Sequence, residues 1–214
     1  LLAERQRNVG KVIGYDFGSS MPVLNQLLSG IQRGHQIVIA ANQGVGKSLF
    51  ATNIINPIAI DQRVPALWIN QEMPEEDCVL RLYSIRTGIN NTRMQTGNFK
   101  NADEVAAFRK ARDDYYKSNL YFYKPVTGTI DEIYGVIEEF KFKHGIQVVV
   151  WDYMQLVVAS KDQRGMSREE VVSHASNVFT NMVAGSLGMA SVCIAQLNRD
   201  NFKEGEVRKA ENIG

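Results

Sequence analysis

Short apolar runs alternate along the chain with longer segments in which apolar residues recur at helical spacing. The strand candidates are five runs rich in Val, Ile and Tyr, at 36–41, 65–71, 119–124, 146–152 and 190–196. Helical spacing occupies the segments 47–57, 74–87, 102–117, 130–143 and 167–187. This alternation predicts an α/β fold, with a mostly parallel, twisted sheet and helices on both of its faces.

Two of the strand candidates carry further information about the core. The run "VVVW" is apolar at successive positions, so both faces of this strand are expected to be covered by helices, which predicts a place in mid-sheet. In "DDYYKSNLYFYK", which contains one of these runs, aromatic residues interleave with lysines as on a platform for single-stranded nucleic acid. Strand alternation directs Tyr121 and Tyr123 to one face and Phe122 to the other, which favours packing in the core.

Composition excludes several classes of protein. With 214 residues, 44% of them hydrophobic, the chain is expected to form one globular domain. Apolar runs of about 18–20 residues are absent, so no membrane contact is expected and an intracellular protein is predicted. Cys78 and Cys193 lie in apolar patterns and are expected to be small buried hydrophobes. The net charge of +1 neither indicates nor excludes a nucleic-acid partner.

Polar segments follow four of the apolar runs directly: "NQGVGKS", "NQEM", "WDYMQ" and "AQLNR". The carboxyl ends of parallel strands meet at one edge of a sheet, and ligands of such sheets bind beyond that edge. The four segments are therefore expected to form a common site.

The first of these segments has the character of a phosphate-binding loop. Glycines let backbone N–H groups approach phosphate oxygens, Lys47 supplies a positive charge, and the Ser48 hydroxyl is a ligand for Mg²⁺. The usual spacing has glycine where this chain has Ala41, whose side chain restricts the backbone to negative φ. Nucleotide contacts are expected from Asn42, Gln43, Gly44, Val45, Gly46, Lys47, Ser48 and Leu49.

The other three segments offer groups suited to hydrolysis. Asp152 ends an apolar run, where its carboxylate can hold Mg²⁺ or a water on the metal. Glu72 can polarise the attacking water as a general base; alternatively it begins a helix, a role that Glu75 and Glu76 fit better. Gln196 can contact the γ-phosphate and respond to its loss, although an ordinary polar strand end explains it equally well.

The C-terminal segment "NRDNFKEGEVRKAENIG" carries four positive side chains among glycine and asparagine. A loop that contacts DNA phosphates has this composition, and so has a solvated surface loop. The candidate DNA contacts are Arg199, Lys203, Arg208 and Lys209.

In this order and context, the motifs resemble those of the motor domain of DnaB-type replicative helicases, from about residue 11 to the end of the chain. That family's phosphate loop begins with alanine, as "ANQGVGKS" does, so Ala41 points toward the family. "NQEMPEEDCVLRL" is similar to its "SLEM" segment and following helix, "WDYMQLV" to "DYLQL", and "AQLNR" to "SQLNR". The chain departs from the pattern at Asn42 and Gln43, which replace Arg-Pro, as a divergent phage or plasmid member would.

The resemblance implies a RecA-like P-loop NTPase core at 19–214, with residues 1–18 as a linker that leads into it. The family's final strands and arginine finger lie beyond Gly214. By position in the motifs, Lys47 and Ser48 bind phosphate and magnesium, Asp152 belongs to the metal site, Glu72 is the catalytic carboxylate and Gln196 is the γ-phosphate sensor.

The activity that the resemblance implies is that of an ATP-dependent replicative DNA helicase, which moves 5′ to 3′ on single-stranded DNA as a hexameric ring. ATP and Mg²⁺ are the implied cofactors, and primase and a helicase loader are candidate partners. The implied location is the cytoplasm of a bacterium, or of the host if the chain is phage encoded.

Two alternatives stay open at this stage. Other RecA-fold ATPases, recombinases or clock-type ATPases, share a phosphate loop, a carboxylate base and a strand-end aspartate. "NQEM" and "AQLNR" favour the helicase over these. A non-catalytic DNA-binding or loading subunit could also keep the pocket as structure. Retention of Lys47, Ser48, Glu72 and Asp152 together argues against it.

Overall fold

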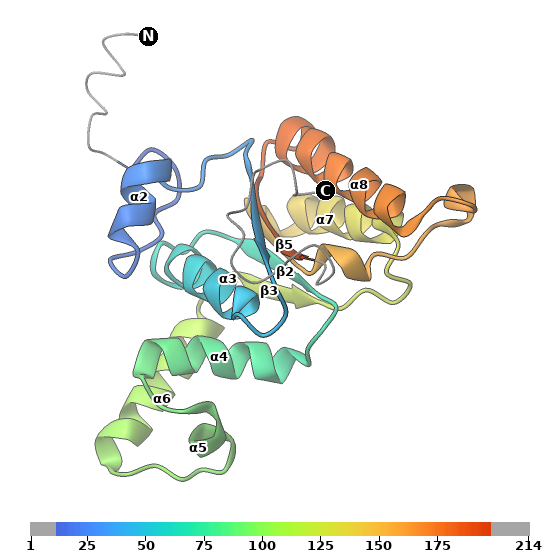
Figure 1. Ribbon diagram of the computed structural model, residues 1–214. Coiled ribbons are helices and arrows are strands. Elements are labelled where there is room, and N and C mark those ends of the chain that lie inside the picture. Colours follow the sequence, from blue (N-terminus) through green and yellow to red (C-terminus); the bar gives the residue numbers. More distant parts are fainter. Residues whose placement is uncertain (1–11, 198–214) are drawn as a thin grey trace, which may run out of the picture.

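A single parallel sheet organises the computed structural model, which describes residues 12–197 (Figure 1). The strands are β1 (Gln36–Ala41), β2 (Ala66–Asn70), β3 (Leu120–Tyr123), β4 (Val148–Asp152) and β5 (Ala190–Gln196). They are arranged in the order β1-β5-β4-β2-β3, and every neighbouring pair is parallel. The five predicted strands are confirmed to within two residues, and β4 lies in mid-sheet as its apolar pattern predicts.

Helical segments cover both faces of this sheet, as the alternation predicts (Figure 1). One face packs against α3 (Lys47–Asn56), η1 (Pro57–Asp61), α4 (Glu75–Thr87) and α6 (Ala102–Tyr116). The other packs against α7 (Ile130–His144), α8 (Arg168–Val178) and η4 (Phe179–Ser186). Each face has its own hydrophobic core. Within β4, Val148 and Val150 pack in the core on the side of α3, whereas Val149 and Trp151 pack in the core on the side of α7.

Aromatic residues of the strands are part of these two cores. Phe122 stacks on Trp68 with ring centroids 5.9 Å apart, on the side of α3. Tyr121 and Tyr123 pack against the opposite cluster, with Trp151. This confirms the core packing predicted for "LYFY", because both of its faces are covered by helices or loops.

Local structure differs from the prediction where periodicity carries little information. The predicted helix 47–57 ends at Asn56, and Pro57 begins the π-helical segment η1 because proline has no N–H to continue the α-helix. The predicted helix 167–187 likewise divides into α8 and the π-helical η4. Two short helices were not predicted, α2 (Pro22–Leu28) and α5 (Asn91–Gln95).

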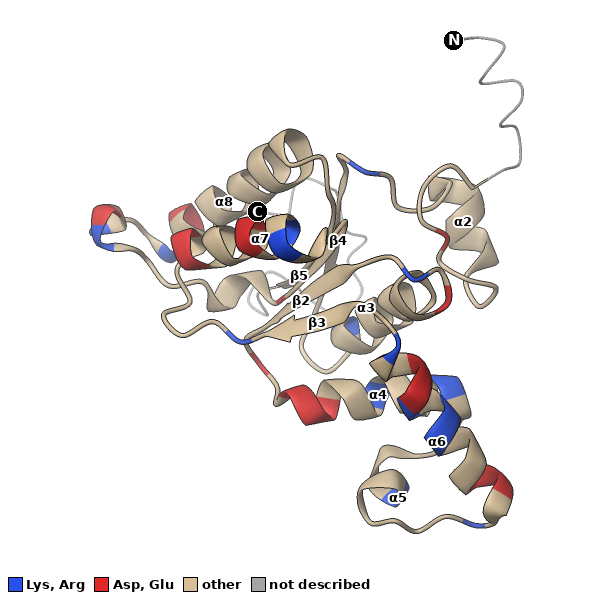
Figure 2. Ribbon diagram, turned by 180° about the vertical axis from the view of Figure 1, so that it is seen from behind, with Lys and Arg blue, Asp and Glu red and all other residues tan. Residues whose placement is uncertain are grey.

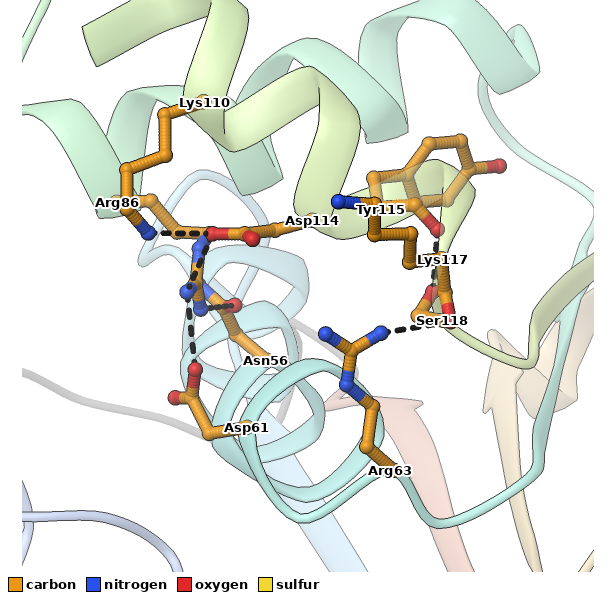
Figure 3. A network of polar contacts seen from close by, with 9 residues as sticks. All are labelled: Asn56, Asp61, Arg63, Arg86, Lys110, Asp114, Tyr115, Lys117 and Ser118. Carbon is orange, nitrogen blue, oxygen red and sulfur yellow. Dashed lines mark hydrogen bonds and ion pairs between the residues drawn. The ribbon is translucent and has the colours of Figure 1, made fainter.

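An ion-pair network holds α4 against its neighbours (Figure 3). The Arg86 guanidinium lies 2.9 Å from the Asp61 carboxylate of η1 and 3.4 Å from that of Asp114 in α6. It also donates to the side-chain carbonyl oxygen of Asn56 at 3.0 Å, and Lys110 donates to Asp114 at 2.9 Å. These contacts join α3, η1, α4 and α6, and thereby fix the helix that follows the "NQEM" turn.

Both cysteines are free and buried, as their apolar patterns predict. Cys193 is fully buried in β5, and burial raises the pKa of its thiol to about 12. Among residues 12–197, no helix has both the length and the apolar character needed to cross a bilayer.

Candidate functional site

The strand register brings the four polar segments together at the carboxyl edge of the sheet. Ala41 of β1 lies opposite Gln196 of β5, so the phosphate loop begins beside the predicted sensor. Asn70 of β2 lies opposite Asp152 of β4, which brings the "NQEM" turn beside the predicted metal ligand. The common site expected from the sequence is therefore present as a spatial cluster.

The loop between β1 and α3 has the backbone of a phosphate cradle. Gly44 and Gly46 have φ of 80° and 95°, which residues with a side chain rarely adopt, so glycine is required at both positions. Gly46 caps α3, whose N-terminal N–H groups and dipole favour a bound anion. Ala41 ends β1 in an extended conformation, as a residue restricted to negative φ must. The alanine is thus compatible with this loop.

A cavity of about 440 Å³ opens beside this loop. Its walls include Gln43, Gly44, Gly46, Lys47, Ser48 and Leu49 of the loop, together with Glu72 and Gln196. The Lys47 ammonium lies at the cavity and donates to the Asn42 carbonyl oxygen at 3.0 Å. Of the residues expected to contact nucleotide, Asn42 and Val45 do not line the cavity.

Asp152 lies behind the cavity wall and is only 1% exposed. Within residues 12–197 its Oδ1 has no hydrogen-bond partner, which is costly for a buried carboxylate. Burial raises the pKa of this carboxyl above its ordinary value, and the nearby Ser48 side chain only partly offsets the rise. A buried carboxylate with a free oxygen beside a hydroxyl fits a hard divalent cation such as Mg²⁺.

Glu72 occupies a short turn between β2 and α4, and its side chain is exposed toward the cavity. It lies outside α4, whose first turn already contains Glu75, Glu76 and Asp77, visible as the acidic start of the helix in Figure 2. These three supply the negative charge that favours a helix N-terminus. The role of a negative charge at the start of α4, which was the alternative for Glu72, is therefore taken by these three residues.

Gln155, the glutamine of the "WDYMQ" segment, binds the end of β5, where the predicted γ-phosphate sensor Gln196 lies. Gln155 lies in the 3₁₀ turn η2 (Met154–Leu156), which follows shortly after Asp152. Its side-chain carbonyl accepts from the Gln196 backbone N–H at 2.9 Å, and its amide donates to the Gln196 carbonyl oxygen at 3.2 Å. The ends of β4 and β5 are thus joined around the metal and sensor positions.

Sequence reasoning missed four residues of the cavity: Met73, Arg81, Ser84 and Asn91. Arg81 and Ser84 share one face of α4 because they are three residues apart, and the positive charge of Arg81 acts to lower the pKa of Asp152. A guanidinium at this place suits a phosphate ligand. The helical pattern of "CVLRLYS" does not reveal it, since a charged residue at such a position is common on solvent-exposed faces.

The loop after β3 approaches the turn that carries Glu72, through Gly128 and Gln71, and is held by one carboxylate. Glu132 of α7 accepts hydrogen bonds from the backbone N–H groups of Val126, Thr127 and Gly128 at 2.6, 2.7 and 2.9 Å. It also accepts from the Tyr123 hydroxyl at 2.8 Å. Burial acts to raise the pKa of Glu132, but these hydrogen bonds outweigh it and hold the pKa at about 2.

Replacing this carboxylate, Glu132→Gln, is expected to lower the free energy of unfolding by about 1–2 kcal/mol, since solvent screens a partly exposed group. Because the folded-state pKa is depressed, the contribution is present above the ordinary value near 4.5 and is lost as the pH falls toward 2. Urea unfolding at pH 7 and at pH 3 measures both effects. Glu138→Gln, on an exposed part of the same helix, is the control. Equal stability of the two variants at pH 7 would contradict the prediction.

A parallel sheet with a glycine-rich cradle, a lysine, a serine and a buried strand-end aspartate defines a P-loop NTPase site on a RecA-like fold. The family model of the DnaB-like helicase C-terminal domain matches residues 17–209. The chain belongs to this family, which also separates it from the recombinases and clock-type ATPases.

Individual relatives are similar at moderate identity. The replicative DNA helicase DnaB of Leifsonia xyli subsp. xyli is 29% identical over 178 residues, which cover 82% of this chain and 38% of the relative. That of Treponema pallidum is 26% identical over 195 residues, covering 91% and 43%. The probable plasmid replicative DNA helicase of Chlamydia muridarum is 27% identical over 169 residues, covering 79% and 36%. The chain thus spans less than half the length of these relatives.

Solved structures share the fold. One of them, an ATPase domain, superposes with a TM-score of 0.85 at 21% identity, over 99% of this chain and 74% of that chain. A DnaB-like replicative helicase, studied with its interactions with primase, superposes with a TM-score of 0.77 at 21% identity, over 92% and 48%. The RecA-like fold is confirmed. The predicted DNA contacts Arg199, Lys203, Arg208 and Lys209 lie outside the described residues.

Proposed function

We propose that this chain is the ATP-hydrolysing motor of a replicative DNA helicase. The observation that carries the proposal is that one cavity is lined by Lys47 and Ser48 of the phosphate loop and also by Glu72 and Gln196. Asp152 is buried behind it. A silent nucleotide pocket requires the phosphate cradle alone. Family membership supports the same function.

The proposed mechanism is positioning combined with charge neutralisation. The N–H groups of the loop and the Lys47 ammonium stabilise the phosphate oxygens, and Arg81 contributes a second positive charge. Ser48 and Asp152 would hold Mg²⁺, which when bound offsets negative charge on the β- and γ-phosphates. The Glu72 carboxylate orients the attacking water and accepts its proton.

Gln196 couples hydrolysis to movement in this proposal. Its amide contacts the γ-phosphate, and its backbone continues from β5 into the segment that contains the predicted DNA contacts. Loss of the phosphate removes a contact to Gln196 and changes the preferred position of that segment. Single-stranded DNA held by Arg199, Lys203, Arg208 and Lys209 would move with it. A hexameric ring and 5′-to-3′ movement are what the resemblance implies. A primase partner is supported by the similar DnaB-like replicative helicase, which was described with its interactions with primase.

The test is ATP hydrolysis by the full-length protein with and without single-stranded DNA. The wild type is expected to hydrolyse ATP faster with DNA, with a stimulation that declines as salt rises because phosphate contacts are screened. Lys47→Ala should lose hydrolysis under both conditions, whereas the exposed Lys100→Ala should keep it. Unwinding of forked substrates with one or the other tail blocked then measures direction.

Two results would contradict the proposal. One is a wild-type protein that assembles normally and hydrolyses nothing at any DNA concentration. The other is a Lys47→Ala variant that hydrolyses ATP at the wild-type rate, because the cavity would then not be the site of hydrolysis.

A further inference from the structure

Side chains on both sides of Glu72 fix the turn that carries it. Asn70, which is 3% exposed, accepts from the Met73 backbone N–H at 3.1 Å and donates to the Met73 carbonyl oxygen. The backbone N–H of Gln71 donates to the Asp152 carbonyl oxygen at 2.9 Å. The residues immediately before and after Glu72 are therefore held, while its own carboxylate stays exposed to the cavity.

The Gln71 side chain makes the longest-range contacts of this turn. Its Oε1 accepts from the Trp151 indole N–H at 2.8 Å, and its Nε2 donates to the Leu156 carbonyl oxygen at 3.3 Å. Trp151 is fully buried and stacks on Phe179 with ring centroids 4.6 Å apart. Gln71 is thus anchored to a rigid part of the core and to the η2 turn.

The loop after β3 closes over the same amide. A Cβ placed on Gly128 would lie 3.1 Å from Gln71 Nε2 and 3.7 Å from the Leu156 carbonyl oxygen. Gly128 is itself held by Glu132 at 2.9 Å. The amide therefore has a defined place between β4, η2 and this loop.

The indole hydrogen bond is not required simply because an indole is buried. Trp68 is 2% exposed, and within residues 12–197 its Nε1 has no hydrogen-bond partner, so this fold accepts an unpaired indole N–H. The "SLEM" segment that "NQEM" resembles has leucine at the position of Gln71, and leucine offers no acceptor. Burial of the indole is therefore not a sufficient reason for the bond between Gln71 and Trp151.

We propose that Gln71 is a positioning residue that sets the backbone of Glu72 through its bond to Trp151. The inference deepens the proposed function and rests on the assignment of Glu72 as the general base. A base is effective only within hydrogen-bond reach of the water that it activates, and small displacements lower the rate steeply. Gln71 contributes by limiting such displacement.

The experiment measures steady-state ATP hydrolysis by the full-length protein with Gln71→Leu, Trp151→Phe and the double variant. Each single variant is expected to lower kcat about 10-fold with the KM for ATP unchanged, because nucleotide binding uses other residues. The double variant should be no slower than the slower single variant, since both changes remove the same bond. Trp68→Phe, which removes an indole N–H that has no hydrogen-bond partner among residues 12–197, should keep the wild-type kcat.

A second measurement separates positioning from general damage. In a Glu72→Gln background, Gln71→Leu should cause no further loss, whereas a merely structural defect would lower the residual rate again. A folded Gln71→Leu protein with wild-type kcat would overturn the inference, and so would an equal loss in both backgrounds. If Gln71→Leu does not fold, the comparison of Trp151→Phe with Trp68→Phe decides, and equal kcat values would overturn it.

The proposed role of Glu72 and the proposed role of Gln71 would be contradicted by different results. Wild-type hydrolysis by Glu72→Gln alone would remove the proposed role of Glu72, whatever Gln71 does. Loss of hydrolysis by Glu72→Gln, together with wild-type kcat for Gln71→Leu and Trp151→Phe, would remove the positioning role of Gln71 and leave the proposed function intact.

Discussion

Glu72→Gln is expected to lower the rate of ATP hydrolysis at saturating ATP by about 10²–10⁴-fold, the usual contribution of a general base. Glutamine has the same shape as glutamate and cannot accept a proton from water. Because Glu72 is exposed and the backbone of its turn is fixed by other residues, the folded structure should be unchanged. Nucleotide affinity should stay close to wild type, since the phosphate loop is intact.

Single-turnover hydrolysis and titration with a fluorescent nucleotide separate these two quantities. Glu76→Gln is the matched control, because this glutamate lies in the first turn of α4 and does not line the cavity. Equal loss of hydrolysis in both variants would point to the charge of the helix start and would contradict the assignment of Glu72. Hydrolysis by Glu72→Gln at the wild-type rate would contradict it as well.

Asp152→Asn is expected to change function and stability in opposite directions. This change removes the proposed carboxylate ligand for Mg²⁺, so Mg²⁺-dependent hydrolysis should fall by at least about 10²-fold. Without nucleotide, the same change should stabilise the protein at neutral pH by about 1–3 kcal/mol. It replaces a buried carboxylate, one oxygen of which has no hydrogen-bond partner among residues 12–197, by a neutral amide.

The stability difference between Asp152→Asn and the wild type should depend on pH, in a direction that follows from the pKa of Asp152. The folded-state pKa of Asp152 is raised above its ordinary value of 3.8, mainly by burial. Wild-type stability that derives from this group is therefore fully present below about 3.8 and is lost as the pH rises through the folded-state pKa. The advantage of Asp152→Asn should be largest at neutral pH and should shrink as the pH falls.

Thermal unfolding of the full-length protein over a pH series, with and without Mg²⁺ and nucleotide, measures both effects. Wild type should gain more stability from Mg²⁺ and nucleotide than the variant does, by mass action. The exposed Asp113→Asn serves as control for the loss of a negative charge. An Asp152→Asn protein that melts no higher than wild type at neutral pH without nucleotide would contradict the prediction.

Much of the fold could be predicted from the sequence because its patterns are local. Runs such as "QIVIAA" and "ASVCIAQ" coincide with β1 and β5, since a short apolar run marks a strand directly, whether it is the partly exposed edge strand β1 or the largely buried β5. The π-helical segments could not be predicted, because the periodicity of α- and π-helical turns is too similar over a few residues. Helices α2 and α5 are only seven and five residues long, too short for a periodic signal.

The residues of the candidate site also divide into those that could be predicted from the sequence and those that could not. Lys47, Ser48, Glu72, Asp152 and Gln196 could be selected from sequence because each lies at or just after the end of a strand candidate. Arg81 and Asn91 could not, because they reach the cavity from α4 and α5. The placement of α4 depends on packing and on the Arg86 network, and that of α5 on its own contacts, such as the ion pair between Arg93 and Glu104. The role of Gln71 depends on an indole 80 residues away in the chain.

The sequence by itself determined the class of fold, the central place of β4 and the segments that meet at the carboxyl edge, because strand patterns and loop glycines are local properties of the chain. The tertiary structure alone decided which oxygen of Asp152 is buried without a partner among the described residues, which helices line the cavity beside the loop, and which side chains hold the turn of Glu72. These depend on distances between residues far apart in the chain, and such distances are set only when the strands pair in register and the helices pack on the sheet.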